Sequence, residues 1–134
     1  MYPEEIVIPM KEELTENGFS ELVSSSEVES QLAKEGTTLV MINSVCGCSA
    51  GTARPGVLMA VANATQKPDY LTTSFAGFDV EAVKTLRQHL APYPPSSPAI
   101  ALFKNGQLVH FIERHQIEGR PAQVIAQNLM GAFE

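Results

Sequence analysis

The sequence predicts an α/β domain in which a central mixed sheet of about four strands lies between two layers of helices. Three observations support this fold class. Short apolar segments typical of buried strands alternate with longer amphipathic segments typical of helices. Asn105-Gly106 separates two strand-like segments and is a strong hairpin signal. The proline-rich residues 91–98 precede that hairpin, so we expect a loop without regular structure there.

The composition is that of a folded protein and excludes several classes of function. The chain has 134 residues, 44 % of them hydrophobic and 18 % charged, and a formal net charge of −6. This charge argues against nucleic acid or an anionic membrane as a partner. The acidic opening Tyr2-Pro3-Glu4-Glu5 is unlike a signal peptide, and no apolar stretch reaches membrane-spanning length. We therefore expect a cytoplasmic protein, in which a close cysteine pair is more often catalytic or metal-binding than structural.

Residues 1–36 are expected to form a helical extension. A first helix follows Pro3 and ends at Asn17-Gly18. Its apolar residues at helical spacing are Ile6, Val7, Met10 and Leu14. A capping box beginning at Ser26 predicts a second short helix that runs to about Glu35.

Residues 37–134 are expected to form the rest of a single domain. The predicted elements are, in order, a strand over Thr38–Asn43, a helix from Ala50 to about Gln66, a strand over Tyr70–Phe75, a helix capped by Asp79, hairpin strands over Ala99–Lys104 and Gln107–Glu113, and a helix from Pro121 to near Gly131. Pro55 predicts a kink or a delayed start in the first of these helices. The inner face of the helix after Asp79 is expected to carry Val80, Val83, Leu86 and Leu90.

This order of elements is that of a thioredoxin-like domain, a three-layer α/β/α sandwich. A right-handed helical crossover joins the parallel strands, and the hairpin closes one edge of the sheet. Ser97-Pro98 directly precedes the first hairpin strand, where that fold places a cis-proline. A loop proline with a trans peptide bond is the alternative.

Cys46-Gly47-Cys48 is the strongest chemical signal in the sequence. These are the only two cysteines, and they lie between the first predicted strand and the helix that follows it. A helix N-terminus favours negative charge, so a thiol placed there ionises more easily, and the thiolate is the reactive form. A disulfide between residues i and i+2 closes a small ring, which we expect to be labile and suited to exchange. Cys46 is assigned as the nucleophile and Cys48 as the resolving thiol, because Cys46 lies nearer the exposed helix start.

The chain resembles the bacilliredoxins, thioredoxin-like proteins with a Cys-Gly-Cys site. The likeness spans almost the whole sequence. The segments that carry it are Val7-Ile8-Pro9-Met10, Asn43-Ser44-Val45-Cys46-Gly47-Cys48-Ser49-Ala50-Gly51, Ala53-Arg54-Pro55, Pro95-Ser96-Ser97-Pro98, His110-Phe111-Ile112-Glu113-Arg114-His115 and Ile117-Glu118-Gly119. The resemblance implies removal of bacillithiol from S-bacillithiolated client proteins, with bacillithiol as co-substrate, no resident cofactor and a bacillithiol-disulfide reductase that recycles the site.

Further residues are expected near the cysteines. Ser97 and Pro98 would present backbone to an extended client peptide. Arg54 either attracts the anionic bacillithiol or belongs to a solvated helix face. Asn43 is either a polar neighbour of the thiols or a turn residue at the end of the strand. Val40 occupies the place where thioredoxins keep a buried acid, so that strand offers no carboxylate to move a proton.

Three other functions remain open at the level of sequence. General disulfide oxidation or isomerisation is the better description in a host that lacks bacillithiol. Alternatively, two thiolates with His110 or His115 suit a Zn²⁺ or Cu⁺ carrier, although structural zinc sites usually have four protein ligands. A thioredoxin-like binding module with inert cysteines is the third possibility. Rapid alkylation of the thiols and metal titration of the reduced protein distinguish these functions.

Overall fold

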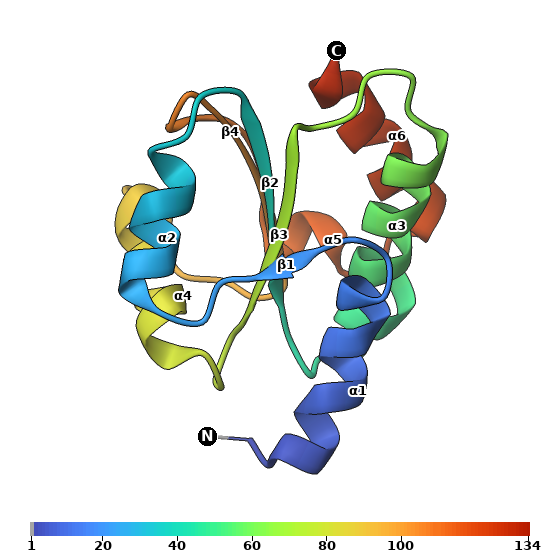
Figure 1. Cartoon of the computed structure of the whole chain (residues 1–134). Helices are drawn as coiled ribbons and strands as arrows, with labels where there is room; N and C mark the ends of the chain where they lie inside the picture. The colour runs from blue at the N-terminus through green and yellow to red at the C-terminus, as the bar shows by residue number, and fades with distance from the viewer. Residues whose placement is uncertain (1) are drawn as a thin grey trace.

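A computed structural model describes residues 2–134. Its elements are α1 (Glu4–Thr15), β1 (Ser20–Glu21), α2 (Ser25–Leu32), β2 (Thr37–Asn43), the π-helical turn η1 (Ser49–Ala53), α3 (Arg54–Asn63), β3 (Tyr70–Phe75), α4 (Val80–His89), β4 (Ala99–Lys104), β5 (Gln107–Ile112), α5 (Arg114–Ile117) and α6 (Ala122–Phe133). Figure 1 shows the sheet between two groups of helices, α2 and α4 on one side and α3 and α6 on the other. No helix in residues 2–134 is long and apolar enough to cross a membrane.

The sheet is mixed and contains five strands in the order β1-β3-β2-β4-β5. Strand β3 runs parallel to both β1 and β2, whereas β4 runs antiparallel to β2 and β5. The fifth strand, β1, was not predicted because it is only two residues long and carries exposed side chains. Residues 1–36 were expected to be helical, yet they supply this edge strand.

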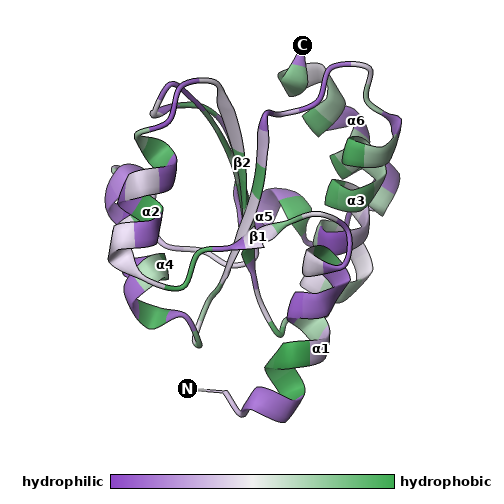
Figure 2. Ribbon diagram, viewed as in Figure 1, coloured by the Kyte–Doolittle hydropathy of each residue, from purple (hydrophilic) through white to green (hydrophobic). Residues whose placement is uncertain are grey.

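The central strand β2 divides the core in two because its side chains alternate between the faces of the sheet. Leu39 and Met41 pack on the face covered by α1, α3 and α6. Val40 and Ile42 pack on the opposite face, against apolar residues of α2 and α4. Strand β2 is buried on both faces, which accounts for its continuous apolar sequence. Figure 2 shows hydrophobic residues along the helix faces that meet the sheet.

Two details of the helices differ from the predictions. The capping box of α2 is formed by Ser24 and Glu27, not by a box beginning at Ser26. Val80 was expected on the inner face of α4, but its side chain is 50 % exposed. Val80 is the first residue of α4. Val83, Leu86 and Leu90 are buried as predicted, and Ala82, Leu86 and Leu90 pack in the core shared with α2 and the sheet.

The hairpin and the loop before it follow the sequence prediction. Asn105 and Gly106 both adopt positive φ, 51° and 81°, as a two-residue hairpin turn requires. The peptide bonds Ala91–Pro92 and Ser97–Pro98 are both cis. Because Ile42 of β2 lies opposite Ala99 of β4, Ser97-Pro98 reaches the sheet where β2 ends. The fold therefore brings this loop beside the segment that carries the cysteines.

Candidate active site

The cysteines lie in the turn between the end of β2 and the helical segment that leads into α3. A disulfide joins Cys46 to Cys48, with their Cα atoms 5.3 Å apart. The carbonyl oxygen of Cys46 accepts hydrogen bonds from the backbone N–H groups of Ser49 at 2.9 Å and Ala50 at 3.3 Å. These bonds form the first helical turn, so the disulfide lies at the amino end of the helical segment, as the sequence predicted.

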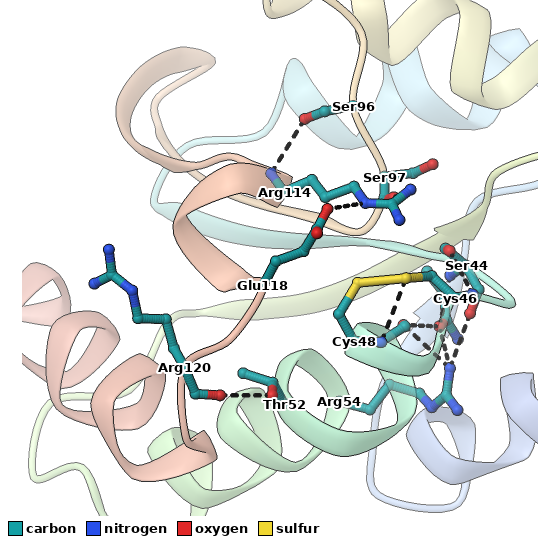
Figure 3. The surroundings of a disulfide bond; sticks show 12 residues. Ser44, Cys46, Cys48, Thr52, Arg54, Ser96, Ser97, Arg114, Glu118 and Arg120 are labelled. Atoms are coloured by element: carbon teal, nitrogen blue, oxygen red, sulfur yellow. Dashed lines mark hydrogen bonds and ion pairs between the residues drawn. A yellow bond between two sulfur atoms is a disulfide. The ribbon is translucent and has the colours of Figure 1, made fainter.

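Two hydrogen bonds involve Cys46 directly. Its sulfur accepts from the backbone N–H of Cys48 at 3.3 Å, and its own N–H donates to Ser44 Oγ at 2.9 Å. The first contact places a polarised N–H against the sulfur that would carry negative charge after reduction. The second fixes the backbone immediately before that sulfur. Figure 3 shows both cysteines above the helix that they begin.

A buried polar network lies under the cysteine turn, and Asn43 is at its centre. Asn43 Oδ1 accepts hydrogen bonds from the Ser44 N–H at 2.8 Å, Ser49 Oγ at 3.0 Å and Arg54 Nη1 at 2.8 Å. Its amide nitrogen donates to the carbonyl of Met10 in α1 at 3.1 Å. Asn43 is therefore both the last residue of β2 and a polar neighbour of the cysteine turn, which combines the two sequence-based alternatives.

Arg54 lies in this network and not on the surface. Its side chain is 1 % exposed, and Nη1 donates to the carbonyl of Ser44 and to Ser49 Oγ, both at 3.1 Å, as well as to Asn43. The alternative that Arg54 belongs to a solvated helix face does not agree with this burial, whereas attraction of an anionic bacillithiol stays a prediction. No local pattern in the sequence predicts that Arg54 is buried, because its hydrogen-bond acceptors come from β2 and the cysteine turn.

Ser96 and Ser97 are held in place from two helices. Arg87 Nη1 donates to the carbonyl of Ser96 at 2.7 Å, and burial lowers the pKa of Arg87 below its usual value. Arg114 Nη1 donates to the carbonyl of Ser97 at 3.3 Å, and Arg114 also pairs with Glu118. Figure 3 draws Ser97, Arg114 and Glu118 in the surroundings of the disulfide. No motif in the sequence indicates these contacts of Arg87 and Arg114, because they depend on how α4 and α5 pack.

A π-helical turn separates the cysteines from α3. Pro55 lies in the first turn of α3, so the α-helix begins at Arg54 and the delayed start expected from Pro55 is confirmed. Within the π-helical turn, Thr52 Oγ1 donates to the carbonyl of Arg120 at 2.7 Å. This bond ties the cysteine-bearing segment to the chain before α6.

The histidines predicted as possible metal ligands do not meet the cysteines. His110 Nε2 lies 2.6 Å from Asn128 Oδ1, at a cavity of about 130 Å³ between β5 and α6, and His115 is exposed on α5. Within residues 2–134, no three His, Cys, Asp or Glu side chains gather in a way that could hold a metal ion.

Comparison with known proteins agrees with the geometry. The family model described as "Disulphide isomerase" matches residues 2–134. A "Bacilliredoxin" of Cytophaga hutchinsonii is 54 % identical over 134 residues, which cover all of this chain and 98 % of the relative. "Bacilliredoxin BH1716" of Halalkalibacterium halodurans is 50 % identical over 98 % of this chain and 92 % of its own length.

Solved structures confirm the thioredoxin-like fold. Oxidised thioredoxin from Plasmodium falciparum superposes with a TM-score of 0.59 at 16 % identity, covering 86 % of this chain and 97 % of that one. Mitochondrial thioredoxin 3 from Saccharomyces cerevisiae, also oxidised, gives 0.57 at 14 % identity, covering 86 % and 92 %. At these identities the likeness concerns the fold alone.

Proposed function

Because the chain belongs to the bacilliredoxin family of thiol–disulfide oxidoreductases, we propose that it removes bacillithiol from S-bacillithiolated proteins. The observation that carries this proposal is the Cys46–Cys48 pair at the amino end of a helical segment, with a backbone N–H directed at the sulfur of Cys46. The names of the relatives point to bacillithiol as the co-substrate. The geometry of the cysteine pair supports thiol–disulfide exchange as the chemistry.

The first step is attack of the Cys46 thiolate on the sulfur of bacillithiol in the mixed disulfide. A Cys46–bacillithiol disulfide forms, the original disulfide breaks, and the client leaves as a thiolate. Cys48 packs partly against the hydrophobic core, which favours Cys46 as the thiol that meets a large client. Ser97 and Pro98, beside the end of β2, are proposed to contact the backbone of the client.

The second step regenerates the site. The Cys48 thiolate attacks the sulfur of Cys46, bacillithiol leaves as a thiolate, and the Cys46–Cys48 disulfide forms. Two electrons and two protons are then needed to restore both thiols. We propose that a bacillithiol-disulfide reductase system supplies the electrons through free bacillithiol, in the cytoplasm of a host that makes this thiol.

Single cysteine variants test both steps. With a purified S-bacillithiolated client, Cys48→Ser is expected to release the client thiol once and to retain bacillithiol on Cys46. Cys46→Ser is expected to release no client thiol, because the attacking sulfur is gone. Intact-mass measurement of client and protein follows both products. Full activity of Cys46→Ser, with the adduct found on Cys48, would reverse the assignment.

Disulfide isomerisation is the second candidate, and the description of the matching family model favours it. Isomerisation needs attack of Cys46 on a protein disulfide, followed by release before Cys48 resolves the adduct. Refolding of a scrambled disulfide protein, with and without bacillithiol, separates the two functions. Reactivation without the small thiol supports isomerisation, whereas reactivity confined to bacillithiolated clients supports the first proposal.

A further inference from the structure

We propose that Arg54 is a positioning residue for thiol–disulfide exchange, whose guanidinium orders the cysteine turn and whose charge stabilises the thiolate of Cys46. Arg54 is the largest of the fully buried side chains in residues 2–134. A buried cation is costly unless its surroundings compensate it, so a guanidinium under the redox pair requires an explanation.

Hydrogen bonds connect the guanidinium to Cys46 in two steps. Nη1 of Arg54 donates to the carbonyl oxygen of Ser44 at 3.1 Å, and the hydroxyl of the same serine accepts from the Cys46 N–H at 2.9 Å. Nη1 also donates to Asn43 and Ser49, which flank the cysteine turn on both sides. The two N–H protons of Nη1 are therefore shared among three acceptors, and this one nitrogen holds the cysteine turn in place.

The hydrogen-bond acceptors in this network do not neutralise the charge of Arg54, which an ion pair with the half-exposed Glu13 compensates only in part. Asn43, Ser44 and Ser49 supply neutral oxygen atoms, which satisfy protons but carry no net negative charge. Nε of Arg54 lies 3.1 Å from Glu13 Oε1 in α1, but their alignment is not that of a hydrogen bond. Glu13 is also 46 % exposed, so solvent weakens its attraction. A positive field from Arg54 thus remains on the side facing the cysteines.

Other charged groups near the disulfide belong to different elements. Figure 3 places Arg114 of α5, Glu118 directly after that helix and Arg120 of the following loop in its surroundings. Arg114 and Glu118 form an ion pair with each other, and both are exposed. Arg120 is exposed as well. Solvent therefore screens these three groups more strongly than Arg54, whose guanidinium is sealed beneath the turn.

The effect on the chemistry follows from charge balance. Two electrons cleave the neutral Cys46–Cys48 disulfide and give two sulfurs, one of which remains a thiolate when a single proton is taken up. A buried cation stabilises that thiolate but has little effect on the neutral disulfide. Arg54 is therefore expected to increase the thiolate fraction of Cys46 at neutral pH and to make the pair more oxidising.

Matched variants in a Cys48→Ser background test this proposal, because Cys46 is then the single thiol. The thiolate is followed by its ultraviolet absorbance as pH is raised, and its reactivity by iodoacetamide alkylation. Arg54→Gln removes the charge but keeps an N–H donor, whereas Arg54→Lys keeps the charge. Glu13→Gln removes the facing carboxylate, and Glu35→Gln makes the same charge change at the opposite end of β2.

Removing the charge of Arg54 and removing the charge of Glu13 are expected to change the thiolate ratio of Cys46 in opposite directions. Arg54→Gln should lower the ratio of thiolate to thiol at neutral pH roughly tenfold, and Arg54→Lys should restore most of it. Glu13→Gln should raise the ratio about twofold, and Glu35→Gln should leave it unchanged. With Cys48 present, a tenfold loss of thiolate stabilisation corresponds to a potential about 30 mV lower.

A purely structural Arg54 would give a different pattern. An unchanged or lower thiolate ratio in Glu13→Gln, relative to Glu35→Gln, overturns the electrostatic role. The same conclusion follows if Arg54→Lys and Arg54→Gln lower the ratio equally. If the Arg54 variants do not fold, Glu13→Gln decides alone, because Glu13 is on the surface. A higher thiolate ratio in Glu13→Gln that disappears in 1 M salt then supports the proposal.

Discussion

At the scale of single residues, Asn43 joins three parts of the chain with one side chain. It ends β2, accepts from the cysteine turn and from Arg54, and donates to α1. Removing a buried amide with several hydrogen-bond partners lowers stability more than removing a surface amide, because each buried partner loses a hydrogen bond that water does not replace. The network therefore serves the fold as well as the site.

Asn43→Ala is expected to lower the free energy of unfolding by about 2–3 kcal/mol, because the buried Ser44 N–H and Ser49 hydroxyl lose the oxygen to which they donate. Asn63→Ala is the matched control. The amide of Asn63 donates to the carbonyl of Met59 at an exposed position, and its loss should cost about 0.5 kcal/mol or less. Urea unfolding of both variants measures the difference, and equal losses would contradict the role assigned to Asn43.

At the scale of elements, the contact between α3 and α6 depends on Gly56. A Cβ at this position would lie 2.8 Å from Cβ of Ile125 and 3.1 Å from the carbonyl oxygen of Ala122. Both distances are shorter than side chains normally allow, and the carbonyl belongs to the backbone of α6. The missing side chain therefore sets how closely the two helices approach beneath the site.

Gly56→Ala should destabilise the protein by about 1–3 kcal/mol, because the added methyl group forces α6 away from α3. Gly51→Ala lies one turn earlier in the chain, and a Cβ there meets nothing within 4 Å. Since alanine also favours helix more than glycine, Gly51→Ala should leave stability unchanged or raise it slightly. Thermal unfolding of the two variants makes the comparison, and similar midpoints would show that α6 shifts without cost.

Elements with a strong local signal were predictable from the sequence, and those that depend on remote partners were not. Strand β3 and the first hairpin strand, β4, match the predicted residues, because each is a short segment rich in apolar or β-branched residues with turn-forming residues at its ends. Strand β1 has neither, and pairing with β3 defines it. Likewise, Cys46 and Cys48 were found from their spacing, but the burial of Arg54 depends on acceptors that only the folded chain brings together.

At the scale of the whole molecule, Lys11 connects the N-terminal helix to the body of the fold. Its ammonium group forms ion pairs with Glu21 of β1 at 2.7 Å and with Asp79, just before α4, at 3.0 Å. It also lies 4.8 Å from the centre of the Phe78 ring. Burial alone would lower the pKa of Lys11, but the bonds to Glu21 and Asp79 outweigh burial and raise it above the ordinary 10.5.

A raised pKa means that the folded state binds this proton more tightly than the unfolded chain. The stability from Lys11 is therefore complete below pH 10.5 and declines as the pH rises through the higher pKa of the folded state. Lys11→Met should lower the free energy of unfolding by about 1–2 kcal/mol at pH 8. The difference should shrink above pH 10.5, whereas the exposed control Lys84→Met should show none at either pH. Urea unfolding at both pH values tests this, and a constant difference would contradict the linkage.

A ribosome delivers the two cysteines well before the loop that lies beside them in the folded protein. Pro98 follows Cys46 by 52 residues, and β4, which completes the pairing of β2, is made later still. At ordinary translation rates this interval lasts roughly 3–10 s. During those seconds the network around Asn43 has no complete sheet to support it. During that interval, the folded site does not determine the disulfide partner of either cysteine. Any accessible thiol that encounters the chain can serve as that partner.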